Sequence, residues 1–222
     1  MQDQPPDLDW TDRGVPVSRR FDDPYFSLDN GLAETRHVFL AGNGLPERFA
    51  PGFHIAELGF GTGLNFLTVW QAWIDSGTEG PLRFTSFEAF PMAAGQMAAA
   101  LTAFPELTPL SAQLVANWDG PGRVILPGAE LTVIAGDARL TLPAWNGQAD
   151  AWFLDGFSPA KNPEMWDDAL LTEVARHMTP GGTLATYTAA GHVRRALAQA
   201  GLAVDRRPGY GRKRHMTVAA RT

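Results

Sequence analysis

The stretch Glu57-Leu58-Gly59-Phe60-Gly61-Thr62-Gly63-Leu64-Asn65-Phe66-Leu67 decides the fold of this chain. The apolar run at residues 53–56 before it predicts a buried strand, and the apolar residues from Leu67 to Trp73 predict a helix. A strand, a glycine turn and a helix bring bare backbone up to a nucleoside cofactor in α/β folds. The stretch therefore predicts a nucleoside-binding α/β domain, and other segments must identify the cofactor.

Strand-like and helical segments alternate along the rest of the chain. Six further segments read as strands, at residues 82–88, 130–137, 149–155, 182–187, 203–206 and 215–219. Apolar residues at helical spacing lie between them, at residues 92–103, 107–118, 167–178 and 192–200. This alternation predicts a mostly parallel sheet covered on both faces, and the short connection at 207–214 predicts that the last two strands pair antiparallel. The expected fold is α/β: a class I methyltransferase Rossmann-like fold with a mostly parallel seven-stranded sheet and a terminal antiparallel hairpin.

The length and composition limit the remaining possibilities. The 222 residues suffice for one substantial domain at 51–222, with residues 1–50 expected as an N-terminal extension packed on the core. The chain has no cysteine, which excludes disulfides, thiolate nucleophiles and cysteine metal sites. We find neither a signal peptide nor a stretch apolar enough to cross a membrane, so we expect a soluble, cytoplasmic protein. The net charge of −6 argues against broad nucleic-acid binding but allows a local basic patch.

The spacing of the glycines and the acids at the strand ends indicate the cofactor. A dinucleotide fingerprint would place its third glycine at position 64, which is Leu64. Glu88 would bind ribose hydroxyls in either cofactor family, whereas Asp137 with the small Ala138 suits an adenine. Strand-end carboxylates are often only turn residues or helix caps, but several of them beside a glycine loop favour a nucleoside site. S-adenosylmethionine fits best, because its positive sulfonium suits an acidic, aromatic site. The predicted cofactor-binding residues are Glu57, Gly59, Phe60, Gly61, Gly63, Asn65, Glu88, Asp137, Ala138 and Asp155.

A second motif, at residues 155–166, is more distinctive than the glycine loop. It combines the strand-end acid Asp155 with a glycine, an aromatic residue, prolines and Trp166. An alkylamine has a reference pKa of about 10.4 and must lose a proton before it can attack a methyl group. Burial against Phe157 and Trp166 would lower the amine pKa, and Asp155 could accept the proton as the catalytic residue. For Trp166 the alternative is an anchor in the core.

At this point the chain resembles a known family. It is similar to the bacterial tRNA wobble-uridine methyltransferases of the MnmC type, which methylate the aminomethyl group of 5-aminomethyl-2-thiouridine. The matching stretches are Phe21-Asp22-Asp23-Pro24-Tyr25-Phe26-Ser27, Gly31-Leu32-Ala33-Glu34-Thr35, Val38-Phe39-Leu40-Ala41-Gly42-Asn43, residues 57–67, residues 155–166 and Gly209-Tyr210-Gly211-Arg212-Lys213-Arg214-His215-Met216. Together they span nearly the whole chain.

The resemblance implies an activity, a partner and one departure. It implies S-adenosylmethionine-dependent methylation of the aminomethyl group at the wobble uridine of tRNA, with the anticodon loop as the bound segment. Bifunctional members carry a second, flavin-dependent oxidase domain, whereas this chain ends at Thr222 without a second glycine fingerprint. We therefore expect the stand-alone form, without flavin or oxidase activity, and a separate enzyme that supplies the aminomethyl substrate.

The predicted substrate contacts come from three regions. Five of the 18 Lys and Arg residues lie at 206–214, around Tyr210, where they could contact phosphate and stack a base. A solvated hairpin is the alternative reading of this basic cluster. Asp23, Tyr25 and Phe26 could help to form a lid over the pocket, or could simply pack the N-terminal extension on the sheet. The predicted substrate-binding residues are Tyr25, Phe26, Phe157, Lys161, Trp166, Tyr210, Arg212, Lys213 and Arg214. The five histidines lack metal-ligand spacing, so no metal site is expected.

Three other functions compete with the methylation of tRNA. A nicotinamide-dependent oxidoreductase would also use a glycine loop and strand-end acids. A methyltransferase or aminopropyltransferase acting on a polyamine or another small molecule would not need the basic hairpin. A catalytically silent tRNA-binding module would bind tRNA without transferring a methyl group.

Overall fold

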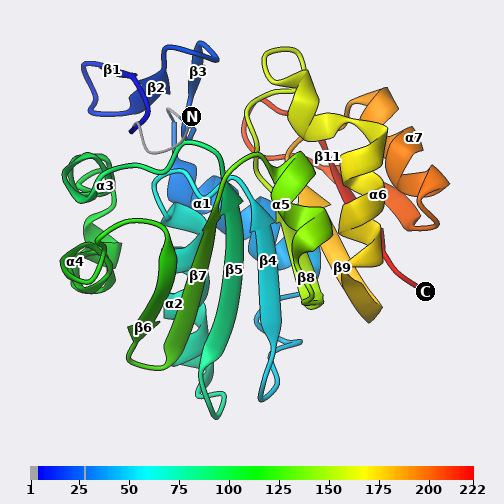
Figure 1. Ribbon diagram of the computed structural model, residues 1–222, viewed down its shortest axis with the longest axis horizontal. Helices are drawn as coiled ribbons and strands as arrows, with labels where there is room; N and C mark the ends of the chain where they lie inside the picture. The colour runs from blue at the N-terminus through cyan, green and yellow to red at the C-terminus, as the bar shows by residue number, and fades with distance from the viewer. Residues whose placement is uncertain (1–4, 28) are drawn as a thin grey trace.

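An eight-stranded sheet forms the centre of the molecule, as the computed structural model shows for residues 5–27 and 29–222 (Figure 1). Its strands lie in the order β10-β11-β9-β8-β4-β5-β7-β6. In chain order they are β4 (His54–Leu58), β5 (Leu82–Glu88), β6 (Gly122–Leu126), β7 (Ala129–Ala135), β8 (Ala149–Leu154), β9 (Met178–Thr186), β10 (Ala203–Pro208) and β11 (His215–Ala220). The strands from β9 to β7 in this order run parallel, and the β10–β11 hairpin is antiparallel, as predicted.

One strand was not predicted, so the sheet has eight strands rather than seven. Strand β6 pairs antiparallel with β7 at one edge of the sheet. It is only five residues long, it begins at a glycine, and Ile125 within it is 59% exposed. A short edge strand with one solvated face gives a weak apolar pattern, and the Pro127-Gly128 turn behind it resembles an ordinary loop.

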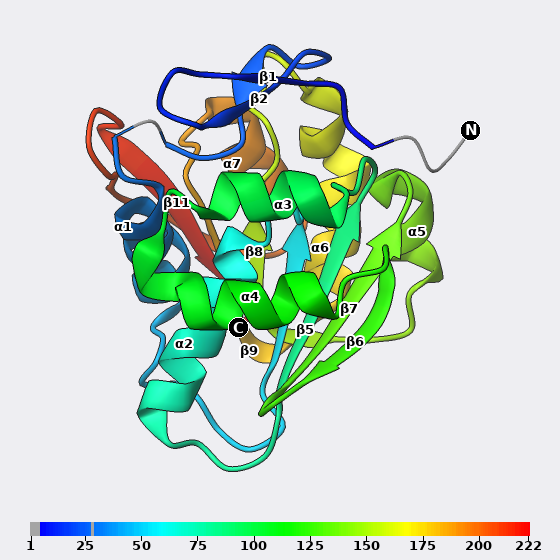
Figure 2. The same cartoon turned by 90° about the vertical axis from the view of Figure 1, so that its left-hand side faces the viewer.

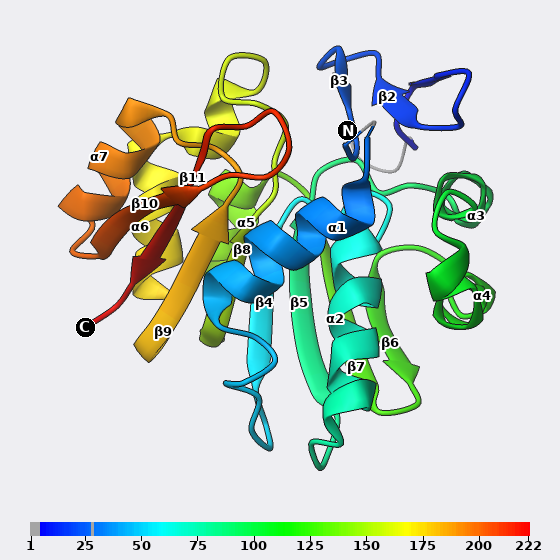
Figure 3. The same ribbon diagram turned by 180° about the vertical axis from the view of Figure 1, so that it is seen from behind.

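Helices cover both faces of the sheet. The face seen in Figure 1 carries α5 (Ala138–Ala144), α6 (Asp168–Arg176) and α7 (Gly191–Gln199), while the opposite face carries α1 (Gly31–Thr35) and α2 (Leu64–Ser76), seen in Figure 3. Helices α3 (Ala94–Leu101) and α4 (Thr108–Ala116) lie side by side toward the β6 edge (Figure 2). The predicted helices correspond to α2, α3, α4, α6 and α7. Helix α5 escaped prediction because it is short and contains Pro143.

The N-terminal segment contributes a small sheet and part of the main core. Strands β1 (Leu8–Trp10), β2 (Pro16–Ser18) and β3 (Asp23–Pro24) form a separate antiparallel sheet. Helix α1 continues into a π-helical turn (Arg36–Leu40) and a 3-10 turn (Ala41–Asn43). Leu32 and Phe39 from this region belong to the same buried cluster as Phe66 and Phe84. A domain boundary at residue 50 stays a prediction, and residues on its two sides share one core.

The strand order creates a switch point at the carboxyl edge of the sheet. Strand β4 lies between β5 and β8 and is parallel to both, so the connections from β4 and β8 leave the same edge in opposite directions. The Gly59 amide donates to the Phe87 carbonyl at 2.9 Å, and the Asp155 amide donates to the Leu58 carbonyl at 3.1 Å. The glycine loop and Asp155 therefore lie side by side where α/β sheets bind ligands. None of the helices in the described ranges combines the length and apolar character needed to cross a bilayer.

We expect Gly59→Ala to destabilise the fold more than Gly52→Ala does. Both glycines have positive φ, at 91° and 82°, but a Cβ on Gly59 would lie 2.5 Å from the Asp155 carbonyl oxygen, whereas a Cβ on Gly52 would meet nothing within 4 Å. Gly52→Ala should lower the free energy of unfolding by about 1 kcal/mol, because alanine is strained at positive φ. Gly59→Ala should lower it by about 3 kcal/mol or more, because the Cβ also clashes with Asp155. Urea unfolding measures both. Equal losses would show that the contact with Asp155 does not constrain residue 59.

Candidate active site

A cavity of about 990 Å³ opens at the carboxyl edge of β4, β5, β7 and β8. This volume lies in the range of pockets that hold a drug-sized ligand or a cofactor. Its wall is built from the glycine loop, the strand-end residues and the N-terminal segment. The predicted residues that line it are Tyr25, Phe26, Gly59, Phe60, Gly61, Asn65, Glu88, Asp137, Ala138, Asp155, Phe157 and Lys213.

The three loop glycines are required by their protein neighbours. Gly59, Gly61 and Gly63 all have positive φ, at 91°, 53° and 79°. A Cβ on Gly61 would lie 3.1 Å from the Tyr25 ring, and a Cβ on Gly63 would lie 3.1 Å from Leu114. Gly63 caps the start of α2 and lies outside the cavity lining, so its predicted contact with the cofactor is not supported by its position. Gly59 and Gly61 line the cavity, where the predicted contact with the cofactor requires them to lie.

Glu88 is held at the cavity by two backbone amides. Its Oε2 accepts from the Gly61 amide at 3.0 Å, and its Oε1 accepts from the Phe90 amide at 2.7 Å. Burial raises the pKa of Glu88, while these N–H donors act in the opposite direction. Glu88 also lines the cavity, so its side chain is fixed at the edge of the space that a ligand would fill. The predicted contact of Glu88 with ribose hydroxyls stays a prediction.

Asp137 is both a residue of the cavity wall and a helix cap. It lines the cavity next to Ala138, yet it also caps α5, since its Oδ1 accepts from the Arg139 amide at 2.9 Å. The Arg139 guanidinium lies 2.5 Å from Oδ2, and this contact lowers the pKa of Asp137. The carboxylate is therefore ionised and oriented. Its predicted contact with an adenine amine stays a prediction, and Arg139 is an additional cavity residue that strand-end reasoning missed.

A buried polar network lies directly beneath the cavity. The Asn65 amide nitrogen donates to Glu57 Oε1 at 2.8 Å and to Asp155 Oδ2 at 2.6 Å. The Asn65 oxygen accepts from the Thr35 hydroxyl at 2.9 Å, and Ser86 donates to Glu57 Oε2 at 2.7 Å. Glu57 has no exposed surface and does not line the cavity, so its predicted direct contact with the cofactor is not supported by its position. Alternation along β4 places its side chain on the face that α2 covers, where it supports Asn65.

Burial controls the protonation of the two carboxyl groups in this network. It raises the pKa of Glu57 to about 8, against the lowering effect of the hydrogen bonds from Ser86 and Asn65. It also raises the pKa of Asp155 to about 7, while the Asn65 hydrogen bond and the Lys213 charge act in the opposite direction. Asp155 therefore exchanges its proton near neutral pH, as a group that takes a proton from a substrate should.

The N-terminal segment forms a wall against the loop that follows β8. The Phe21 ring stacks on Phe157 with centroids 4.8 Å apart, and Tyr25 meets the same ring edge-on at 5.0 Å. Asp23 Oδ2 accepts from the Ser158 amide at 2.8 Å. These contacts bring Tyr25, Phe26 and Phe157 to the cavity as predicted for the pocket, and they add Phe21, which was not among the predicted site residues.

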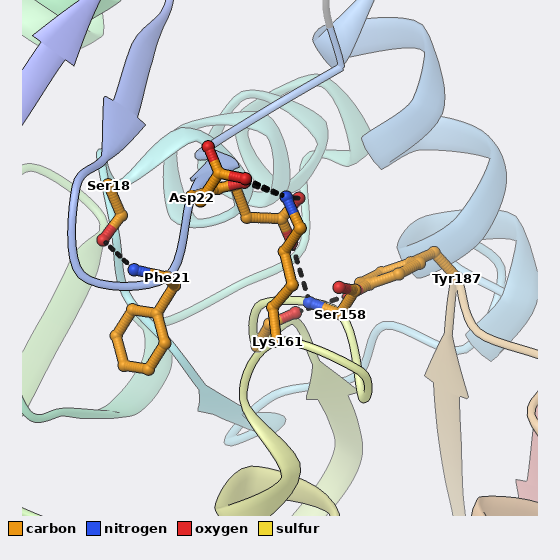
Figure 4. Close-up of polar contacts among 8 residues, drawn as sticks. Ser18, Phe21, Asp22, Ser158, Lys161 and Tyr187 are labelled. Carbon is orange, nitrogen blue, oxygen red and sulfur yellow. Dashed lines mark hydrogen bonds and ion pairs between the residues drawn. The ribbon is translucent and has the colours of Figure 1, made fainter.

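Two predicted substrate residues support this wall from outside the cavity. Figure 4 shows the Lys161 side chain bonded to Asp22. The Lys161 ammonium donates to the Asp22 carbonyl oxygen, and its Nζ lies 3.1 Å from Asp22 Oδ2. Trp166 is only 2% exposed, and its indole donates to the Phe157 carbonyl at 2.8 Å. Neither residue lines the cavity. For Trp166 the alternative reading as an anchor in the core therefore describes its position, since its ring fills the space beneath the loop.

The basic hairpin lies at the rim of the cavity. Lys213 lines the cavity, whereas Tyr210, Arg212 and Arg214 do not. The Arg212 side chain is 94% exposed, and the half-buried Tyr210 lies beside His37, with ring centroids 5.9 Å apart. The structure thus separates the predicted substrate residues of the hairpin into one that lines the cavity and three that do not.

Sequence reasoning also missed two residues of the cavity wall. Glu34 on α1 pairs with Lys213, the Glu34 Oε1 and Lys213 Nζ atoms being 2.7 Å apart. Tyr187 follows β9, and the centroid of its ring lies 4.1 Å from the same Lys213 nitrogen. Glu34 lies within a stretch that carried the family resemblance, but no spacing rule pointed to its role. Nothing in the sequence near Tyr187 marks it as a site residue.

Comparison with known proteins agrees with this architecture. Residues 104–222, more than half of the chain, match the model of a family described as S-adenosyl-L-methionine-dependent methyltransferases. The chain belongs to this family and is an enzyme that uses S-adenosyl-L-methionine. This assignment removes the nicotinamide-dependent alternative.

A solved structure gives a narrower likeness. The crystal structure of MnmC2 from Aquifex aeolicus is 25% identical, has a TM-score of 0.75, and is matched over 98% of this chain and 71% of that chain. This likeness, together with the family match, supports the assignment of the chain as an MnmC-type methyltransferase. TrmN from Thermus thermophilus (19% identity, TM-score 0.55, 93% of this chain and 54% of that chain) shows a similar fold. So does precorrin-6y C5,15-methyltransferase from Geobacter metallireducens (11% identity, TM-score 0.54, 95% of each chain).

We expect Glu57→Gln to flatten the pH dependence of stability. A glutamate in the unfolded chain ionises around its ordinary pKa of 4.5, while folded Glu57 keeps its proton up to about pH 8. The folded state therefore binds more protons in this window, and the free energy of unfolding falls as pH rises through it, by up to about 1.4 kcal/mol per unit for one group. A glutamine removes this contribution and can still bond to Asn65 and Ser86.

Urea unfolding at several pH values between about 5 and 8 tests this expectation. Glu79→Gln, at an exposed glutamate, is the matched control and should keep the slope of the parent protein. If Glu57→Gln kept that slope too, Glu57 would be ionised inside the fold.

Proposed function

We propose that this enzyme methylates the aminomethyl nitrogen of 5-aminomethyl-(2-thio)uridine at the wobble position of tRNA. The observation that carries the proposal is the position of Asp155, between the glycine loop and the aromatic wall of Tyr25 and Phe157. The family resemblance of the stretches at residues 21–27, 155–166 and 209–216 supplies the substrate.

The cavity has the features that S-adenosylmethionine requires. Gly59 and Gly61 present backbone to the cavity, and Glu88 lines it at the end of β5, where it would meet ribose hydroxyls. Asp137 with Ala138 would place an adenine beside a carboxylate. Leu64 and Asn65, at the start of α2, line the cavity together with Asp155. When bound there, the cofactor supplies an electrophilic methyl group.

Asp155 is suited to prepare the amine for attack. A free alkylamine is protonated at neutral pH, and burial against Phe157 and Tyr25 disfavours that cation. Asn65 orients the Asp155 carboxylate through Oδ2, which leaves Oδ1 available to accept the proton. Holding two reactants in line and excluding water supplies much of the remaining rate enhancement.

The basic hairpin gives this acidic protein a place to hold an anticodon loop. Arg206, Arg207, Arg212 and Arg214 are exposed on β10 and on the turn that leads into β11, next to the cavity mouth marked by Lys213. Phosphate contacts position an RNA, and an unpaired base in a loop can leave its stack at low cost. A polyamine substrate is the second candidate, favoured only by the acidic residues of the cavity.

We expect Asp155→Asn to lower kcat/KM for tRNA at least about 100-fold while cofactor binding stays measurable, because the variant keeps the shape but cannot accept a proton. In the parent enzyme, kcat/KM should rise with pH until the Asp155 carboxyl, whose pKa is raised to about 7, is ionised, and should level off above that pH. Radiolabelled methyl transfer to tRNA lacking the modification, followed by nucleoside analysis, measures both. Unchanged turnover in Asp155→Asn would contradict the proposed role.

We expect the double variant Arg212→Glu/Arg214→Glu to raise the KM for tRNA about tenfold or more, since two phosphate contacts become repulsive. The matched control is Arg83→Glu, at an exposed arginine on the opposite, amino end of β5. Increasing the salt concentration should raise the KM of the parent enzyme for tRNA, so that it approaches the KM of the double variant. An unaltered KM for tRNA, or methylation of a polyamine without tRNA, would favour the small-molecule function.

A further inference from the structure

A cation already occupies part of the cavity, and it belongs to the chain itself. The Lys213 ammonium lies 2.7 Å from Glu34 Oε1 and 4.1 Å from the centroid of the Tyr187 ring. A carboxylate together with an aromatic face is an arrangement that binds alkylammonium groups. We call Glu34 and Tyr187 the ammonium site.

The two residues of the ammonium site are fixed before any ligand binds. The Glu34 side chain is only 12% exposed and is carried by α1, whose start is capped by Asn30. The Tyr187 hydroxyl donates to the Gly156 carbonyl at 2.7 Å, and the Tyr187 ring packs edge-on against Trp166 at 6.2 Å. A preorganised site loses little entropy when it binds its ligand.

The lysine in this site is much less constrained than the site itself. The Lys213 side chain is 45% exposed and extends from the turn between β10 and β11. A half-exposed lysine loses rotamer freedom when it is held in one place, and its ion pair contributes little net stability. Another ammonium of suitable reach can therefore replace it.

The ammonium site also lies next to the group that would take the proton. Glu34, Tyr187 and Lys213 line the same cavity as Asp155. The Gly156 carbonyl that holds Tyr187 directly follows Asp155 in the loop after β8. An alkylammonium held over Tyr187 therefore enters beside the Asp155 carboxylate.

We propose that Glu34 and Tyr187 bind the ammonium group of the substrate beside Asp155, and that Lys213 occupies this place until the substrate displaces it. The inference rests on the amine methylation proposed above and names the residues that recognise the amine. One cation replaces another, so the charge of the cavity is unchanged by the exchange. An N–H proton of the bound ammonium then passes to the Asp155 carboxylate, which leaves a neutral amine and a carboxylic acid.

This role differs from a simple phosphate contact by Lys213. If Lys213 only bound RNA phosphate, its removal would weaken tRNA binding and leave the binding of small amines unaltered. If Lys213 fills the ammonium site, its removal frees the site. An internal competitor that holds the site about nine-tenths of the time reduces the apparent affinity for an added amine about tenfold.

The test uses n-propylammonium chloride as the probe and the protein saturated with S-adenosylhomocysteine. Calorimetric titration should show that Lys213→Met binds the probe about tenfold more tightly than the parent. Adding Glu34→Gln to Lys213→Met should abolish this gain, because the carboxylate partner is lost. Arg214→Met removes a positive charge one position away and should leave the affinity for the probe within about twofold of the parent.

The binding of propylammonium and the methylation of tRNA are measured separately, so the ammonium site and the tRNA substrate can fail independently. Thermal unfolding and titration with S-adenosylhomocysteine establish that each variant is folded and binds the cofactor product. An unaltered affinity of Lys213→Met for propylammonium would overturn the ammonium site, even if tRNA is methylated. A tenfold gain in an enzyme that does not methylate tRNA would support the ammonium site and refute the tRNA substrate.

Discussion

The site depends on a single amide, that of Asn65, which connects two buried carboxyl groups. Both of its N–H donors are used, one toward Glu57 and one toward Asp155, and its oxygen accepts from Thr35. Four elements of the fold, α1, α2, β4 and the end of β8, therefore meet at one side chain. Buried carboxyl groups without a donor are costly, so the network fixes the register of these elements as well as the orientation of Asp155.

The wall that the N-terminal segment forms against the loop after β8 is held by weaker contacts than the Asn65 network. The wall consists of ring stacking between Phe21 and Phe157, the Asp23–Ser158 hydrogen bond and the exposed Lys161–Asp22 pair. Each of these contributes only modestly to stability. The part of the cavity formed by the strand ends, where we propose that the cofactor binds, is thus held by the sheet. The part formed by the N-terminal segment is held by weaker contacts that can exchange.

The sequence predicted the sheet because apolar runs and turn residues are local signals. It predicted the cavity lining at Gly59, Glu88, Asp137 and Asp155, since these residues follow or end parallel strands and must meet at one edge. It could not show which way Glu57 points, because that depends on which face α2 covers. Contacts between distant residues, such as those of Glu34 and Trp166, leave no local pattern in the sequence. Helix α5 and strand β6 are too short to show a recognisable apolar pattern.

The pairing of Glu34 with Lys213 has a consequence for the order in which the molecule assembles. These two residues are 179 positions apart, and the strand that carries the hairpin turn back to the sheet is the last one in the chain. A contact between residues so far apart in the sequence forms after local structure, because the entropy of loop closure is lost before the contact can stabilise the fold. The cavity is therefore finished only when the β10–β11 hairpin has docked beside α1, and ligand binding reports on that docking.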